Sequence, residues 1–324
     1  MPKMQDAHID RALTNISVAY LQDASAFIAD KVFPIVPVKR QSDVFYTYNK
    51  GDFMRDEAQV RGAGTESAGG DYGVEAADPY YCRKHAFHKD ITEEERVNYD
   101  EPLNADTDAT DFVSQKMLIR REMEWASKFF TTGVWGTEIA GAEAAGEGTV
   151  AKWDLATSNP IKDITDAAVK MASETGFKPN TLVLSPYAFN ALKNHEDILD
   201  RIKYTQKGIV TTDLLATLFE VEHVYVAWGV VNTAAKGAAD SVGFIMGKNA
   251  LLCYSAPRPA LRKPSAGYIF AWTGLEGAGA YGNRIVRLPM DQLGLGTERI
   301  EGEIAFDVKK VCADLGIFFK DIVG

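Results

Sequence analysis

The sequence predicts an α+β fold in which a long helix lies across an antiparallel sheet and a compact α/β lobe follows. Three observations support this prediction. Residues 108–132 carry an amphipathic helical pattern, residues 160–262 alternate between short strand-like and helix-like segments, and residues 263–310 return to strands.

The N-terminal residues 1–43 are predicted to form an arm and not a domain of their own. Pro34 and Pro37 exclude a helix around them and favour an extended path. A weak helical pattern runs from Leu21 to Ala29. Two interpretations follow: an arm lying over another surface, or a short helix packed on the core of its own chain.

A long polar hairpin is predicted over residues 46–88. Residues 44–48 and 80–91 are rich in strand-forming side chains. Between them lies RGAGTESAGGDYGVEAAD, in which five of eighteen residues are glycine. Ordering such a loop costs about 1–2 kcal/mol per residue, and its side chains cannot form a core to offset that cost. We therefore expect a neighbouring molecule to supply its packing surface; the alternative is a disordered surface loop.

The predicted long helix over residues 108–132 begins in an acidic turn and ends before Gly133. Its apolar positions recur at helical spacing and form one face. That face comprises Phe112, Ile119, Met123, Ala126 and Phe130, widened by Val113 and Met117. A helix of this length is expected to lie across a sheet.

The Gly/Ala-rich residues 133–150 are predicted to form a loop and a domain hinge. Asn159 and Pro160 then begin a second helix, which Gly176 ends. Short elements follow, and together they predict an α/β lobe with its own core. They are strands at 181–185, 221–231, 243–246 and 251–254, and helices at 186–195 and from 212 onwards.

The last strands are predicted within residues 263–310, at 267–272 and 299–309. The second of these alternates strictly, with Ile300, Gly302 and Ile304 on one face and charged residues on the other. This pattern predicts an antiparallel strand with one wet face.

Composition excludes several classes of protein. The net charge of −10 disfavours tight general binding to nucleic acid. No run of eighteen apolar residues is present, so no membrane span is predicted, and the N-terminus lacks the apolar stretch of a secretory signal. Three widely spaced cysteines indicate reduced thiols in a cytoplasmic setting.

Few residues suggest chemistry. Cys82, His85 and His88 are metal-ligand types, but a strand places His85 on the opposite face from the other two. Neither glycine-rich stretch has the phosphate-loop form, and Ser185 lacks the flanking glycines of a nucleophile elbow. Glu93–Glu95 is interpreted as a solvated acidic turn. No catalytic residue, cofactor or metal is therefore predicted, and the chain is not expected to be an enzyme.

The order of arm, long hairpin, long helix on a sheet and α/β lobe resembles the major capsid protein of tailed bacteriophages. That fold is shared with encapsulin shells and the herpesvirus capsid floor. Three phrases also resemble a branch of phage capsid sequences: NPIKDITDAAVKMASETGFKPNTLVLSP, DRIKYTQKGIVTTDLLATLFEVEHVYV and KPSAGYIFAWTG. The resemblance covers nearly the whole chain.

The resemblance implies a domain organisation. It comprises an N-terminal arm (1–43), a peripheral domain (44–159) with an extended loop (46–88) and a spine helix (108–132), an axial domain (160–262), return strands of the peripheral domain (263–310) and a C-terminal segment (311–324).

The resemblance also implies a function: a structural subunit that self-assembles into the icosahedral shell of a phage head around double-stranded DNA. The implied partners are identical subunits in pentamers and hexamers, a scaffolding protein, a portal, and packaged DNA bound without sequence specificity. Assembly would take place in the host bacterial cytoplasm and the mature location would be the virion. The alternatives are an encapsulin-like compartment and a soluble enzyme with a long lid hairpin.

Under this resemblance the extended loop rests on the adjacent subunit. The residues expected at that contact are Arg55, Asp56, Glu57, Arg61, Glu66 and Tyr72. Glycines in the loop would let it adjust to pentamer and hexamer positions. An acidic shell wall would repel DNA phosphates and let packaged DNA slide.

Overall fold

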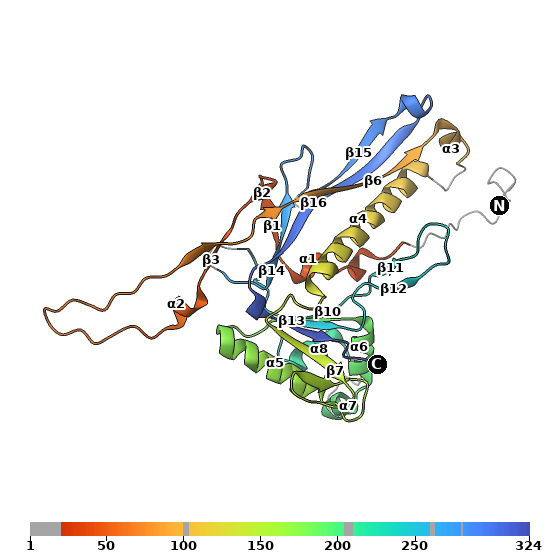
Figure 1. Ribbon diagram of the computed structural model, residues 1–324. Coiled ribbons are helices and arrows are strands. Elements are labelled where there is room, and N and C mark those ends of the chain that lie inside the picture. Colours follow the sequence, from red (N-terminus) through yellow and green to blue (C-terminus); the bar gives the residue numbers. More distant parts are fainter. Residues whose placement is uncertain (1–20, 100–103, 204–209, 260–262, 280) are drawn as a thin grey trace.

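The computed structural model describes residues 21–99, 104–203, 210–259, 263–279 and 281–324. Figure 1 shows an elongated molecule with two parts. One part is a five-stranded sheet with a long helix along it, and the other is a six-stranded sheet with shorter helices. A narrow hairpin projects from the side of the molecule, away from both.

The five-stranded sheet is built around β16 (Glu298–Lys310). On one edge β16 pairs with β6 (Arg83–Ile91), and on the other it pairs in succession with β15 (Asn283–Pro289) and β14 (Gly267–Trp272), all antiparallel. β1 (Ile35–Val38) adds to β14 in parallel. The predicted strands at 267–272 and 299–309 are confirmed, whereas β15 was not predicted.

Helix α4 (Ala105–Phe129) is the predicted long helix and packs along β16 and β6 (Figure 1). It begins three residues before the predicted start because the Asn104 side chain accepts the amides of Asp106 and Thr107. At Gly302 the sheet comes very close to the helix: a Cβ there would lie 2.4 Å from Cγ1 of Val113. Glycine is thus required at this contact.

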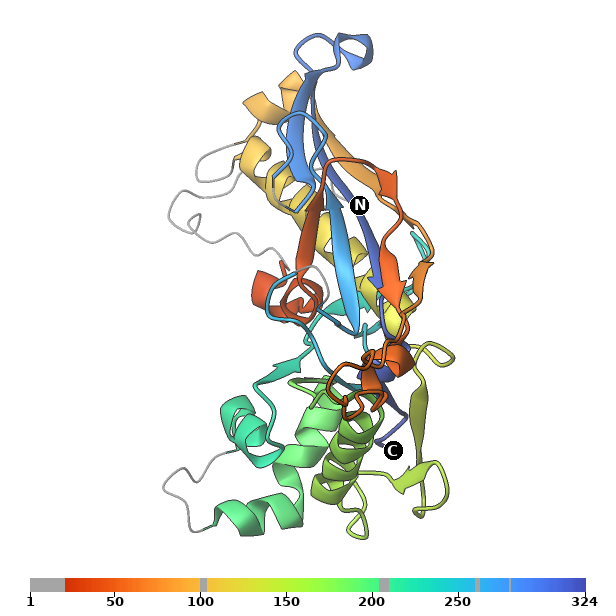
Figure 2. The same cartoon turned by 90° about the vertical axis from the view of Figure 1, so that its left-hand side faces the viewer.

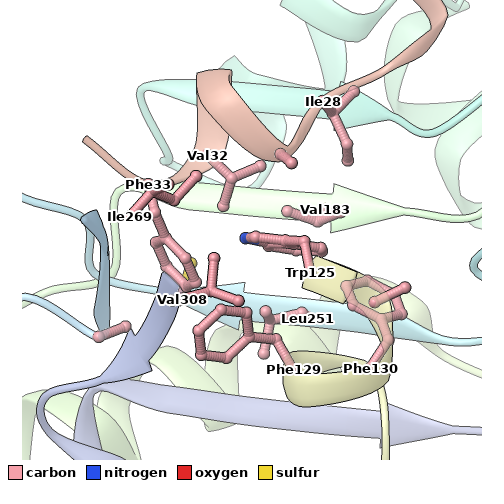
Figure 3. Close-up of a cluster of buried hydrophobic side chains, with 14 of the residues drawn as sticks. Ile28, Val32, Phe33, Trp125, Phe129, Phe130, Val183, Leu251, Ile269 and Val308 are labelled. Atoms are coloured by element: carbon pink, nitrogen blue, oxygen red, sulfur yellow. The ribbon is translucent and has the colours of Figure 1, made fainter. Parts of the chain in front are cut away.

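The predicted apolar face of α4 was partly wrong. Phe112 is 42% exposed, and Ile119 and Met123 are only half-buried. Val113, Ala126 and Phe130 of the predicted face are buried, together with Trp125 and Phe129, which were not predicted and which pack with Phe33 (Figure 3). The buried flank is displaced because the N-terminal segment, and not only the sheet, covers the helix.

The N-terminal segment packs on the core of its own chain. It contains η2 (Ala24–Ala26), α1 (Ala29–Val32) and β1, and Figure 3 shows Ile28, Val32 and Phe33 around Trp125. Residues 27–33 pack on the core of their own chain, as in the second interpretation, but the helix Ala29–Val32 begins where the predicted helical pattern ends. Residues 1–20 lie outside the described residues.

The outer face of β16, predicted to be wet, is also largely covered. Glu303 is 5% exposed and Asp307 is 8% exposed. Lys84 and Arg284 pair with Glu303, while Lys128 and the Tyr81 amide bind Asp307. This prediction was wrong because the neighbouring strands and α4 supply cations and the root of the hairpin lies over the same face.

The second sheet has the strand order β10-β9-β13-β17-β7-β8. Its strands are β7 (Thr137–Ala142), β8 (Thr149–Ala151), β9 (Thr181–Leu184), β10 (His223–Val226), β13 (Ala250–Cys253) and β17 (Gly316–Lys320). β7 and most of β8 lie within 133–150, so the predicted loop there is wrong. Small residues are needed because a Cβ at Gly141 would lie 2.2 Å from the Asp321 carbonyl oxygen.

Four of the described helices pack against this sheet; three of them were predicted, and α7 (Glu196–Ile202) was not. They are α5 (Pro160–Thr175), α6 (Pro186–Asn194), α7 and α8 (Thr212–Leu218). Asn159 caps α5 by accepting the Lys162 amide, and Gly176 ends it in the left-handed region at φ 75°. The predicted strand at 221–231 is interrupted: it divides into β10 and β11 (Val230–Asn232), which forms a hairpin with β12 (Val242–Phe244).

Candidate inter-subunit surface

The predicted hairpin is present and is formed by two short antiparallel ladders. β2 (Ser42–Asp43) pairs with β5 (Tyr80–Tyr81), and β3 (Tyr46–Tyr48) pairs with β4 (Val74–Ala76). The chain between β3 and β4 extends well beyond the body of the subunit (Figure 1). Its second arm continues through Tyr81 towards β6, so the hairpin is a direct extension of the five-stranded sheet.

Aromatic stacking anchors the root of the hairpin. Tyr80 stacks on Phe270 with ring centroids 4.5 Å apart, and Phe45 stacks on the same ring at 5.8 Å. Cys82 is fully buried in this cluster, and burial raises the pKa of its thiol to about 12. Because Phe270 pairs with Asp307, the root lies on the face of the sheet opposite α4.

Further out, α2 (Lys50–Met54) holds the two arms of the hairpin together. The Asn49 side chain caps this helix, and Lys50 forms an ion pair with Asp314 of the subunit body. The rings of Tyr48, Phe53 and Tyr72 meet with centroids 5.6–5.9 Å apart. The hairpin thus has an anchored root and a ring cluster at mid-length.

The remaining part of the hairpin has no packing surface on its own subunit. Every residue from 53 to 76 is exposed, and Val60 is exposed completely. The tip contains one turn, in which the Thr65 amide donates to the Gly62 carbonyl and Gly64 has φ 78°. A projecting, fully exposed segment of this length is a candidate contact surface.

The six predicted contact residues all lie in this exposed segment, but the structure gathers only some of them. Arg55 lies 3.3 Å from Asp52 and 3.9 Å from Glu57, so it belongs to a network within the hairpin. Arg61 donates from Nε to the Thr65 carbonyl at 2.5 Å. Tyr72 belongs to the ring cluster.

Asp56 and Glu66, the other two predicted contact residues, are exposed and form no ion pair among the residues that the structure describes. Sequence reasoning missed Phe53, which is 64% exposed although it belongs to the ring cluster. Its position beside Tyr48 and Tyr72 depends on how the two arms of the hairpin align. The spacing of apolar residues along the sequence does not predict that alignment.

A buried serine–histidine pair was also missed in the sequence. The hydrogen bond between its two side chains runs in the wrong direction for catalysis. Ser158 Oγ lies 3.0 Å from His195 Nε2. The Asp197 amide donates to His195 Nδ1, so a neutral ring carries its proton on Nε2 and donates to Ser158. Ser158 in turn donates to the Leu155 carbonyl. A nucleophile would have to donate to the histidine, so this pair supports the loop before α5 and not a reaction.

The other chemical candidates lie apart. Ser185 caps α6 by accepting the Ala188 amide. His85 is on the face of β6 that meets α4, whereas His88 is on the opposite face, 3.9 Å from Asp90. In the described part of the chain no three His, Cys, Asp or Glu side chains converge as metal ligands.

Two further sequence predictions concerned an acidic turn at Glu93–Glu95 and the absence of a membrane-spanning helix. The predicted acidic turn forms α3 (Glu93–Val97), in which Glu95 pairs with Lys89. Within the described ranges, none of the helices has the length and apolar character needed to cross a bilayer.

Sequence comparison gives related capsid proteins. Residues 141–254 match the family model of phage major capsid protein E. The chain is 28% identical over 323 residues to a major capsid protein of Pseudomonas phage JBD67, covering 97% of each chain. It is 26% identical over 248 residues to a major capsid protein of Burkholderia phage BcepMu, covering 76% of each.

Structural comparison agrees over nearly the full length. A phage-related protein from Bordetella bronchiseptica superimposes with a TM-score of 0.69 at 24% identity, covering 92% of this chain and 93% of the other. The capsid protein of cyanophage P-SCSP1u gives 0.61 at 10% identity, covering 98% and 93%. The SrpI encapsulin of Synechococcus elongatus gives 0.57 at 11% identity, covering 96% and 93%. The chain thus resembles the major capsid proteins of tailed phages in sequence, and its fold is the one that phage capsids share with encapsulins.

Proposed function

We propose that this chain is the structural subunit of a phage capsid shell, built by self-assembly of many copies. The observation that carries the proposal is the exposed hairpin: residues 53–76 project from the body of the molecule and none of them is buried. Ordering costs about 1–2 kcal/mol per residue in backbone entropy. A contact with an adjacent copy would offset that cost. The sequence similarity to phage major capsid proteins supports the same conclusion.

The proposed contact is heterologous, because the hairpin of one copy meets a different surface on the next. Heterologous contacts close into rings when the rotation between copies fits, so one subunit can form pentamers and hexamers. Arg55, Asp56, Glu57, Arg61 and Glu66 would lie at this contact, together with Tyr72. Because each exposed ion pair contributes only about 0–1 kcal/mol, stability would come from repetition over the shell.

The proposed role is non-enzymatic. The one serine–histidine pair described above is arranged to support structure, and the net charge of −10 suits a wall that does not hold DNA phosphates. We also propose that the shell is an icosahedral head around double-stranded DNA. It would assemble with scaffolding and portal proteins in the host cytoplasm and become part of the virion.

An electron-microscopy experiment tests the proposal. The chain is expressed alone and together with the genes that flank it, and both preparations are fractionated by size and imaged in negative stain. We expect closed shells in at least one preparation. A uniform 35.5 kDa monomer in both would contradict the proposal.

The contents of the purified particles distinguish this proposal from an encapsulin-like compartment, which shares the fold. The two curated relatives are major capsid proteins, which favours a DNA container. We expect nuclease-protected DNA in particles assembled during infection. A single enclosed protein and no nucleic acid would favour the compartment instead.

A further inference from the structure

An exposed group of apolar side chains lies where helix α6 meets the β11–β12 hairpin. Trp228 is 51% exposed, Tyr187 of α6 is 46% exposed and Val242 of β12 is 64% exposed. The half-buried ring of Phe244 joins them: its centroid lies 5.3 Å from that of Tyr187 and 6.1 Å from that of Trp228, both in edge-on contact. Val242 and Phe244 share one face of β12 because they are two positions apart.

We name Tyr187, Trp228, Val242 and Phe244 the aromatic patch. Single exposed apolar side chains are common on protein surfaces, whereas a contiguous group of large ones marks a surface that binds something. The aromatic patch therefore calls for an occupant.

The first described residues of the chain run beside this patch. Ala26 accepts the amide of Gly229 at 3.1 Å. Gln22 binds both backbone groups of Val230: its Nε2 donates to the carbonyl and its Oε1 accepts the amide, each at 2.9 Å. Figure 1 shows this part of the chain, in red, reaching the β11–β12 hairpin. Since Val230 is two positions from Trp228, the chain that precedes Gln22 starts next to the aromatic patch.

The sequence of residues 1–20 suits an apolar contact. Ile9, Leu13, Ile16 and Tyr20 recur at spacings of four, three and four, the spacing of side chains on one side of a helix. The charged side chains of this segment are two cations and two carboxylates, so their charges cancel. Twenty residues span about 30 Å even with helical rise and more when extended. The segment is therefore long enough to cover a patch that begins beside its anchor.

We infer that residues 1–20 cover the aromatic patch of their own chain, with their apolar side chains against its rings. The anchor at Gln22 favours this occupant over a separate molecule. A segment tethered so close meets the patch at an effective concentration of about millimolar, without any second binding event. Covering the patch also removes exposed apolar surface from water. The inference goes beyond the proposed function and does not depend on it, because it concerns a contact within one chain.

Fluorescence quenching by acrylamide tests the contact. Trp228 is the most exposed of the five tryptophans, and the difference between a protein and its Trp228→Phe variant isolates its signal. Deleting residues 2–20 should raise the quenching of Trp228 at least about twofold, because its indole would lose its cover. Equal quenching in the full-length and the shortened chain would overturn the inference.

Point substitutions locate the contact within the segment. Ile9→Asp, Leu13→Asp and Ile16→Asp together should raise the quenching as the deletion does. The matched control, Ala7→Asp with Thr14→Asp and Asn15→Asp, adds the same charge on the opposite side of the apolar pattern and should behave like the wild type. Equal effects of the two triple variants would show that the apolar side chains do not make the contact.

Photo-cross-linking identifies the occupant directly. Unassembled subunits that carry Ile16→p-benzoylphenylalanine are prepared in isotopically labelled and unlabelled form, mixed and irradiated. We expect cross-links from position 16 to the aromatic patch, each within a single chain. Cross-links between labelled and unlabelled chains would assign the patch to a second copy, and cross-links elsewhere would show that the segment binds another surface; either result would overturn the inference. Neither result bears on the proposed function, which the formation of shells decides.

Discussion

At the scale of single residues, Glu122 is the least expected feature. It lies within α4, has no exposed surface, and accepts the amides of Ile28 at 3.1 Å and Ala29 at 2.9 Å. Beside it, Arg121 pairs with Asp30 at 3.1 Å. These contacts join residues more than ninety positions apart, so no local pattern could indicate them. Glu122 therefore fixes the N-terminal segment to the long helix.

The pH dependence of Glu122 can be tested. Burial raises its pKa from 4.5 to about 6, although the amides of Ala29 and Ile28 oppose the shift. Because the folded state binds the proton more tightly, stability rises as the pH falls from about 7 to 4.5, by up to roughly 2 kcal/mol. Glu122→Gln should lack this gain. The check is the free energy of unfolding of both proteins across this range, and parallel curves would contradict the prediction.

Removing the acceptor altogether should be worse than removing its charge. Glu122→Ala leaves two buried amides unpaired, and each costs about 1–3 kcal/mol. We expect this variant to unfold at clearly lower denaturant concentration than Glu122→Gln at pH 7, and its Ile28 and Ala29 amides to exchange faster. Equal stability of the two variants would show that the segment does not depend on these hydrogen bonds.

Gly302 gives a prediction about close packing. A Cβ at this position would lie 2.4 Å from Val113 and 3.4 Å from Met117, so Gly302→Ala must push α4 away from the sheet. We expect a loss of about 1–3 kcal/mol in the free energy of unfolding. Gly243→Ala is the matched control: this strand glycine has open space around it. Similar losses in both variants would indicate a strand-propensity effect and not a packing effect.

At the scale of elements, cross-strand ion pairs hold the outer face of the five-stranded sheet. Glu303 lies directly opposite Arg284 on β15, and their side chains are 2.5 Å apart; Lys84 of β6 binds the same carboxylate. Arg299 pairs with Asp90 across β16 and β6 in the same way. The three strands are therefore joined by charges as well as by their backbone ladders.

This arrangement predicts sensitivity to acid. Burial alone would raise the pKa of Glu303, but hydrogen bonds from Lys84 and Arg284 outweigh it and the pKa is lowered below 4.5. A lowered pKa contributes stability that is present above pH 4.5 and is lost below it. The stability difference between the wild type and Glu303→Gln should therefore shrink as the pH falls below about 4.5. A constant difference down to pH 3 would exclude these ion pairs as its cause.

The elements that could be predicted are those specified by local chemistry. Helix α5 was predicted at both ends because Asn159 and Gly176 act within one turn of the helix. β7 and β8 could not be predicted, because their glycines and alanines are required by close contacts with residues far away in the sequence. Gly141 against Asp321 is an example. The buried flank of α4 was misplaced for the same reason, since residues 27–33 cover it.

At the scale of the whole molecule, the order of parts was predictable and their packing was not. The hairpin, long helix and α/β lobe follow the predicted sequence of segments. The six-stranded sheet, however, draws β7, β8 and β17 from outside residues 160–262. The limits of the peripheral and axial domains therefore remain a proposal. Of the candidate site, the exposed segment was predictable from its polar composition, but the ring cluster depends on the folded arrangement.

The exposed tip of the hairpin should separate folding from assembly. In this variant the dipeptide Gly-Ser takes the place of residues 56–70, which shortens the hairpin. The ring cluster of Tyr48, Phe53 and Tyr72 is kept, and only exposed side chains are removed. The free energy of unfolding of the unassembled subunit should change by no more than about 0.5 kcal/mol, since no buried contact is lost. Assembly, followed by sedimentation and microscopy, should be abolished. Shortening the exposed turn 234–239 between β11 and β12 is the control for loop length and should leave assembly intact. Normal shells from the tip variant would mean that the chain orders its hairpin for some purpose other than contact between copies.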